Sequence, residues 1–100
     1  MARMDGGGAT PETILVLFQA DGHRFSARNL ATAAHRVGKF GGHRVRNDRR
    51  LRELAEACRS RIHDFEPQDI SSTAWGVAKT GFVERRLFEA IAAEASSRIA

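Results

Sequence analysis

The sequence predicts an all-α protein: a fragment of a right-handed α-solenoid made of stacked helical hairpins, with about two and a half repeats. The first observation is an internal repeat. Residues 25–41 (FSARNLATAAHRVGKFG) align without a gap on residues 65–81 (FEPQDISSTAWGVAKTG), forty positions further along, and repeats of this length are typical of stacked helix pairs. The second observation is that apolar residues recur every three or four positions, without the sustained alternation that strands show.

The first predicted helix covers about residues 10–21. Thr10 is a suitable N-cap, Pro11 fits the first helical position, and Glu12 places a negative charge in the first turn. This helix looks like the second half of a hairpin, so we expect further repeats in a longer chain. The predicted organisation is a disordered lead, a partial repeat and two repeats, at residues 1–9, 10–24, 25–64 and 65–100.

The first full repeat is expected to contain two helices. Ser26 is placed to cap a helix over residues 26–40, which a glycine pair ends. An arginine-rich connection then leads to a helix over residues 48–63, capped by Asn47 or Asp48. The apolar residues of that second helix fall on one stripe: Leu51, Leu54, Ala55, Cys58 and Ile62.

The second repeat follows the same plan. Pro67 is expected to open a helix over residues 67–80, and Gly81 to end it. Its partner helix is predicted over about residues 83–98. The corresponding apolar stripe is expected at Phe88, Ile91, Ala92, Ala95 and Ile99.

The leading helix of each repeat has two faces suited to packing. One is apolar and is expected to contact the partner helix of the same hairpin: Leu30, Ala33, Ala34 and Val37, then Ile70, Thr73, Ala74 and Val77. The other combines small residues with one large ring and is expected to pack against the neighbouring hairpin: Ala31, His35 and Gly38, then Ser71, Trp75 and Ala78. For Trp75 the alternative is stacking on a nucleobase, and packing between repeats is preferred.

The third face of each leading helix is polar: Asn29, Thr32, Arg36 and Lys39, then Asp69, Ser72, Gly76 and Lys79. In stacked hairpins the leading helices line one concave surface, and polar groups at a fixed pitch allow helical repeats to read single-stranded RNA. We therefore predict RNA-binding residues at Asn29, Thr32, Arg36, Lys39, Ser72 and Lys79. The alternative is an ordinary solvated helix face.

Five arginines fall within nine residues, from the connection after the first of these helices into the start of the next, and only Asp48 opposes them. Arginines near a helix N-terminus are suited to phosphate. The candidates for phosphate contacts are Arg44, Arg46, Arg49 and Arg50. The alternative is a solvated linker.

Composition restricts the remaining function classes. The formal net charge is +4, which favours polyanionic partners without proving one. No apolar run approaches the ~20 residues needed to span a bilayer. Cys58 is the only cysteine, lies on the predicted core stripe, and has no nearby partner in a metal-binding spacing. No nucleophile, base and acid can be grouped, so we expect neither an enzyme nor a cofactor or metal.

These features together resemble a known family. Residues 67–81 (PQDISSTAWGVAKTG) are similar to the "NxLWAxAKLG" helix of octotricopeptide and FAST kinase-like repeats, and residues 29–40 (NLATAAHRVGKF) resemble the variant with His-Arg in place of the tryptophan turn. The resemblance covers residues 25 to about 99. It implies an RNA-binding protein of a mitochondrion or plastid, acting in RNA processing, stability, translation or ribosome assembly. Neither a RAP domain nor a kinase motif is matched.

Two other interpretations stay open. The same helical repeats could form a protein-interaction scaffold, such as a subunit of an organellar ribosome or other complex. Two residues on the predicted concave face favour that alternative: Asp69 is acidic, and Gly76 has no side chain. The chain could also be a truncated fragment without a function of its own.

Overall fold

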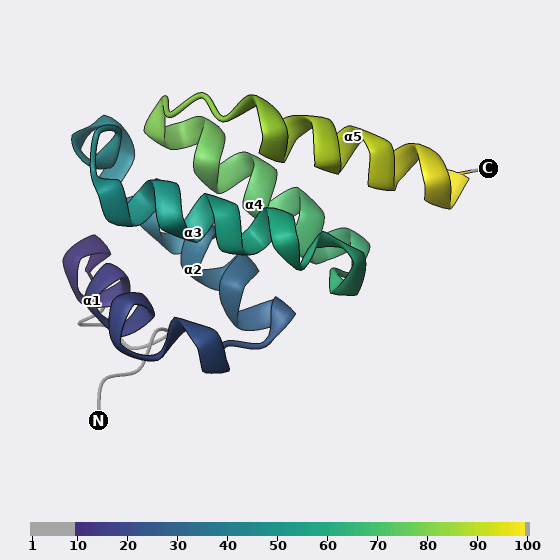
Figure 1. Cartoon of the computed structure of the whole chain (residues 1–100). Coiled ribbons are helices and arrows are strands. Elements are labelled where there is room, and N and C mark those ends of the chain that lie inside the picture. Colours follow the sequence, from purple (N-terminus) through teal and green to yellow (C-terminus); the bar gives the residue numbers. More distant parts are fainter. Residues whose placement is uncertain (1–9, 100) are drawn as a thin grey trace.

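The computed structural model describes residues 10–99, and within them it consists of helices and turns without strands (Figure 1). The predicted all-α class is confirmed, whereas the expected lead at residues 1–9 lies outside the described residues. The five α-helices are α1 (Pro11–Asp21), α2 (Ala27–Gly41), α3 (Arg49–Ser60), α4 (Pro67–Thr80) and α5 (Arg85–Ile99). Short 3-10 turns at Gly22–Arg24, Gly42–Val45 and Ile62–Asp64 connect the first four.

Three of the predicted helix starts are confirmed by their hydrogen bonds. Thr10, Ser26 and Asp48 each have a side-chain oxygen that accepts from the backbone N–H two or three residues later, at 3.1, 3.1 and 2.9 Å. Such caps satisfy N–H groups that have no partner within the helix. At the other end of α4, Gly81 adopts a φ of 76°, a left-handed conformation that favours glycine and stops the helix.

The leading helices α2 and α4 lie side by side and run in the same direction, as Figure 1 shows. Arg28 pairs with Asp69 near their N-terminal ends, and Gly38 meets Gly76 further along. Helix α3 packs against α1, α2 and α5. This parallel arrangement agrees with the predicted equivalence of the two hairpins. The right-handed solenoid remains a proposal.

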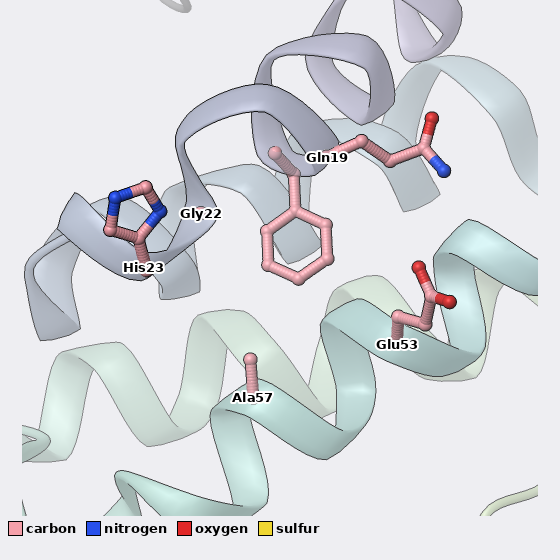
Figure 2. A pocket seen from close by; sticks show the side chains of 6 residues that line it. Gln19, Gly22, His23, Glu53 and Ala57 are labelled. Carbon is pink, nitrogen blue, oxygen red and sulfur yellow. The ribbon is translucent and has the colours of Figure 1, made fainter.

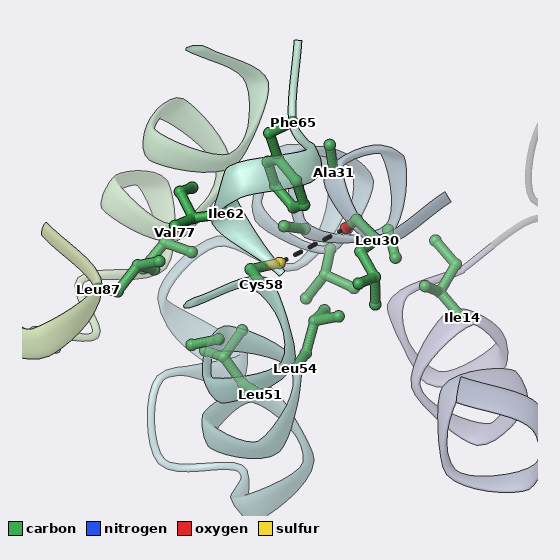
Figure 3. Close-up of a cluster of buried hydrophobic side chains, with 14 of the residues drawn as sticks. Ile14, Leu30, Ala31, Leu51, Leu54, Cys58, Ile62, Phe65, Val77 and Leu87 are labelled. Carbon is green, nitrogen blue, oxygen red and sulfur yellow. Dashed lines mark hydrogen bonds between the residues drawn. The ribbon is translucent and has the colours of Figure 1, made fainter. Parts of the chain in front are cut away.

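The apolar stripe predicted for residues 51–62, four members of which lie on α3 and Ile62 in the turn after it, lies in the centre of the core. Its five members are all buried, and Figure 3 shows four of them, Leu51, Leu54, Cys58 and Ile62, among side chains from α1, α2 and α4. The Cys58 thiol donates a hydrogen bond to the Leu30 carbonyl, with 3.8 Å between sulfur and oxygen. Burial raises the pKa of this thiol to about 12.

The stripe predicted for the last helix is wrong by one position. Leu87 is fully buried there, whereas Phe88 and Ile91 are half-buried. Ala92 and Ala95 are exposed, and the Ile99 side chain lies outside the described residues. Helix α5 packs on α3, α4 and the turn before α4, so only one narrow strip of its surface is covered.

Two predicted boundaries also move. Helix α5 begins at Arg85, two residues later than expected, and α3 ends at Ser60 instead of residue 63. Beyond Ser60 the chain tightens into the 3-10 turn Ile62–Asp64, which places both Ile62 and Phe65 in the core. Burial of these two side chains explains why the helix does not continue.

Candidate nucleic-acid interface

The candidate interface is built on a close crossing of α2 and α4 at two glycines. A Cβ atom added to Gly76 would lie 2.6 Å from the carbonyl carbon of Ala34 and from the Cα of His35. One added to Gly38 would lie 2.6 Å from the carbonyl carbon of Gly76. Ordinary contact begins at 3.4 Å, so neither position has room for a side chain. The backbones of the two helices are therefore in direct contact.

This crossing corrects the predicted polar face of the second repeat. Gly76 is buried against α2, and Asp69 is only 3% exposed. The Asp69 carboxylate pairs with Arg28 and accepts a hydrogen bond from the Glu66 backbone N–H at 3.0 Å. Both residues belong to the contact between hairpins. The prediction that Gly38 packs against the neighbouring hairpin is confirmed.

The predicted RNA-binding residues all reach the surface of α2 and α4. Asn29, Lys39 and Lys79 are exposed, and Thr32, Arg36 and Ser72 are half-buried. Helical spacing places Thr32, Arg36 and Lys39 on the side of α2 away from Leu30 and Val37, with Ser72 and Lys79 on the corresponding side of α4. We call this surface, with the two rings described next, the α2–α4 wall.

Two aromatic rings lie on the wall. His35 of α2 and Trp75 of α4 stack with 4.7 Å between ring centroids and 28° between planes. The Lys79 Nζ lies 5.3 Å from the centroid of the Trp75 ring. Burial, followed by the charges of Lys39 and Arg36, lowers the pKa of His35, which favours the neutral form of its imidazole.

The expected packing of Trp75 is correct only on one side. It meets His35 across the two hairpins, as predicted, but the residue is 42% exposed. The predicted packing between repeats is therefore confirmed for the side of the indole that meets His35, while the rest of the ring stays open. The alignment contained a hint of the stack, because His35 and Trp75 occupy equivalent positions of the two copies.

The charges on the wall are all of one sign. Helix α2 contains no acidic residue, and the single acid of α4 is the buried, paired Asp69. Among residues 10–99, Arg36, Lys39 and Lys79 form no ion pair. Five arginines in that range do pair with carboxylates: Arg28, Arg50, Arg59, Arg61 and Arg98. The wall thus presents unneutralised positive charge.

The four arginines proposed for phosphate contacts divide into two groups. Arg44, Arg46 and Arg49 are exposed, and Arg46 packs against Gly81 at the C-terminal end of α4. Arg50 has a different role, because its guanidinium binds the carboxylates of Glu12 and Asp48.

The Arg50 contacts are short and hold two helices together. Its Nη2 lies 2.7 Å from a carboxylate oxygen of each acid, and its Nη1 lies 2.8 Å from the second oxygen of Glu12. Hydrogen bonds from Arg50 lower the pKa of both Glu12 and Asp48. Arg50 therefore connects α1 to the start of α3 and is already neutralised.

A separate hollow of about 420 Å³ lies between α1 and α3, lined by Phe18, Gln19, Gly22, His23, Glu53 and Ala57. Figure 2 shows His23 and Glu53 on opposite sides of it. None of the predicted site residues lines this hollow. In the part of the chain that the structure describes, no three His, Cys, Asp or Glu side chains are grouped as metal ligands. The candidate site is therefore the α2–α4 wall.

None of the helices formed by residues 10–99 is both long and apolar enough to cross a membrane. Comparisons with protein-family models, with curated proteins and with solved structures found no match.

Proposed function

We propose that this protein binds single-stranded RNA on the α2–α4 wall without catalysing a reaction. The observation that carries the proposal is the charge of the wall: Arg36, Lys39 and Lys79 point outward from two helices that expose no acidic side chain. Neutralisation of phosphates by such side chains supplies most of the affinity in non-specific binding of nucleic acids. Arg44, Arg46 and Arg49 would extend the contact beyond the ends of the helices.

The arrangement of the wall supports a single strand as the ligand. Each leading helix offers one hydroxyl and one lysine at equivalent positions, Thr32 with Lys39 and Ser72 with Lys79. Packed helices lie ~8–10 Å apart, so these groups recur at a fixed interval. Helical-repeat proteins read unpaired bases in this way, with two or three side chains for each base. We place the protein among organellar helical-repeat proteins of RNA processing, stability, translation or ribosome assembly, in a mitochondrion or plastid.

Charge reversal tests the proposal. The double variant Lys39→Glu/Lys79→Glu removes two cations from the wall, and the matched control Arg52→Glu/Arg59→Glu removes two from α3. Both variants lower the net charge equally, so a difference between them reports position. Affinity for a fluorescein-labelled single-stranded RNA is measured by anisotropy at several salt concentrations.

We expect wild-type affinity to fall with salt, with a log–log slope of about −0.7 for each phosphate contact. The wall variant should lose binding, and the control should keep the wild-type affinity and slope. A wild-type affinity that does not change with salt, or equal losses in the two variants, would overturn the proposal.

A protein-interaction scaffold is the second candidate. The two features that favoured it in the sequence, Asp69 and Gly76, are buried between hairpins and no longer bear on it. A different observation does: an open groove of about 330 Å³ between α4 and α5, lined by Pro67, Ile70, Ser71, Ala95 and Arg98. Association through this groove predicts a sedimentation coefficient that rises with concentration in the wild type but not in Ala95→Glu. That outcome, without binding of RNA, would favour the scaffold.

A further inference from the structure

We infer that Trp75 is a stacking platform for an unpaired base of single-stranded nucleic acid. The inference rests on the proposed function and adds to it a specific site and ligand group. Its basis is the partly covered indole: His35 lies against it at 4.7 Å, and yet 42% of the residue is exposed.

Position and support distinguish Trp75 from the other exposed apolar residues. The large hydrophobic residues exposed within residues 10–99 are Val16, Phe40, Trp75 and Val83. Among these four, Trp75 is the one whose ring stacks on another ring. A ring held on one side is restrained before the ligand arrives, which lowers the entropic cost of binding. The indole itself is flat, so a flat aromatic group is the complementary ligand for its exposed part, beside the Lys79 Nζ that lies over the ring.

The two copies of the repeat show how such a ring is covered. His35 and Trp75 are equivalent in the alignment, and the His35 ring is covered by the next ring in the series, Trp75. Among the described residues no further ring covers Trp75. A base stacked there would continue the series by the same interaction, in the order His35, Trp75, base. Any base is suitable, because every base has an aromatic face.

Charge decides which flat ligand is favoured. The Lys79 Nζ lies 5.3 Å from the indole centroid, and Lys39 occupies the equivalent position on α2. Neither helix exposes a carboxylate that would attract a basic peptide. A nucleotide combines a base with a phosphate. One nucleotide can therefore stack on the indole ring and pair with the lysine. An acidic peptide would pair with the lysine but would not stack on the ring, and the experiment below distinguishes it from a nucleotide.

The sequence provides a direct probe, because Trp75 is the only tryptophan and the chain has no tyrosine. Emission excited at 295 nm therefore reports this residue alone. The full chain is titrated with a ten-nucleotide oligouridylate, an abasic oligomer of equal length, inorganic polyphosphate and oligoglutamate. We expect the oligouridylate to quench the emission and the three ligands without bases to leave it nearly unchanged.

Substitution gives an independent readout by anisotropy with the labelled oligouridylate. Trp75→Ala should weaken binding about 5- to 150-fold, the range that corresponds to the loss of one stacked base. Trp75→Phe should retain most of the affinity. The salt slope should stay the same in both, because stacking does not release counterions. Circular dichroism verifies that each variant is folded.

The outcomes separate this inference from the proposed function. Binding of the oligouridylate with unchanged Trp75 emission overturns the platform and leaves RNA binding in place. Equal quenching by polyphosphate or oligoglutamate also overturns it, because the indole would then report charge or an acidic peptide. Absence of binding to any oligonucleotide at low salt overturns the proposed function itself.

Discussion

Substitution of Gly76 by alanine tests the close crossing of α2 and α4. In an isolated helix this change is favourable, because alanine has the higher helix propensity, by about 1 kcal/mol. In this structure the new methyl group would lie 2.6 Å from backbone atoms of Ala34 and His35, where ordinary contact begins at 3.4 Å. Backbone atoms have no alternative rotamer, so α2 and α4 must move apart.

The size of the effect follows from the two opposing terms. A gap of about 0.5–1 Å forfeits a quarter to a half of the attraction at each contact it opens. Overpacking of a tight site costs about 1–3 kcal/mol, and we take the upper end because both helices must shift. After the gain in propensity, Gly76→Ala should lower the free energy of unfolding by about 2 kcal/mol. That is close to thirty-fold in the folding equilibrium.

Urea unfolding followed by circular dichroism measures this change as a lower midpoint at constant slope. Ala78→Gly is the control: it lies on the exposed side of α4 and should cost only the propensity difference of about 1 kcal/mol. Gly38→Ala should lower the free energy of unfolding by a similar amount. The double variant should cost less than the sum of the two, because a single separation of the helices relieves both clashes. If Gly76→Ala stabilised the protein, the two backbones would not be in contact.

Two further predictions concern single buried groups. The pKa of Cys58 rises from an ordinary value near 9 to about 12 on burial, so the unfolded chain loses this proton first and stability should fall as pH rises from 9 toward 12. Cys58→Ala should lack that part of the decline in urea midpoint between pH 8 and pH 10. Asp69→Ala removes both the pairing with Arg28 and the hydrogen bond to the Glu66 N–H, and should cost about 2 kcal/mol. Asp69→Asn should cost roughly half as much, because its amide oxygen still accepts that hydrogen bond; equal costs would show that the bond contributes nothing.

Local patterns predicted much of the fold because they depend on neighbours in the chain. Thr10, Ser26 and Asp48 cap helices as expected, and the α3 stripe is buried throughout. A gapless alignment also predicted that α2 and α4 are equivalent. The alignment did not predict how deeply equivalent residues are buried, because they meet different neighbours. His35 is covered by α4, whereas Trp75 meets His35 on one side and remains 42% exposed.

The site could be predicted in composition but not in shape. The exposed lysines of α2 and α4 follow from helical spacing, and they lie on the surface as expected. Helical spacing and the alignment with Arg36 place Gly76 on the polar face, and a glycine has no side chain that would indicate otherwise. Only the crossing geometry places it against Ala34. Arg50 could not be separated from its arginine neighbours either, since its partner Glu12 lies 38 residues away in the chain.

The distribution of ion pairs bears on whether the wall is an ordinary solvated face. Such faces usually mix charges, and pairs three or four residues apart stabilise the helix. Helices α3 and α5 follow that pattern, with Arg59 beside Glu56 and Arg98 beside Glu94. Helices α2 and α4 do not: the residues four positions before Lys39 and Lys79 are His35 and Trp75, whose rings stack between the two helices. Packing accounts for these two positions, and a polyanionic ligand would disfavour acids at the other exposed positions, because each exposed carboxylate would repel it.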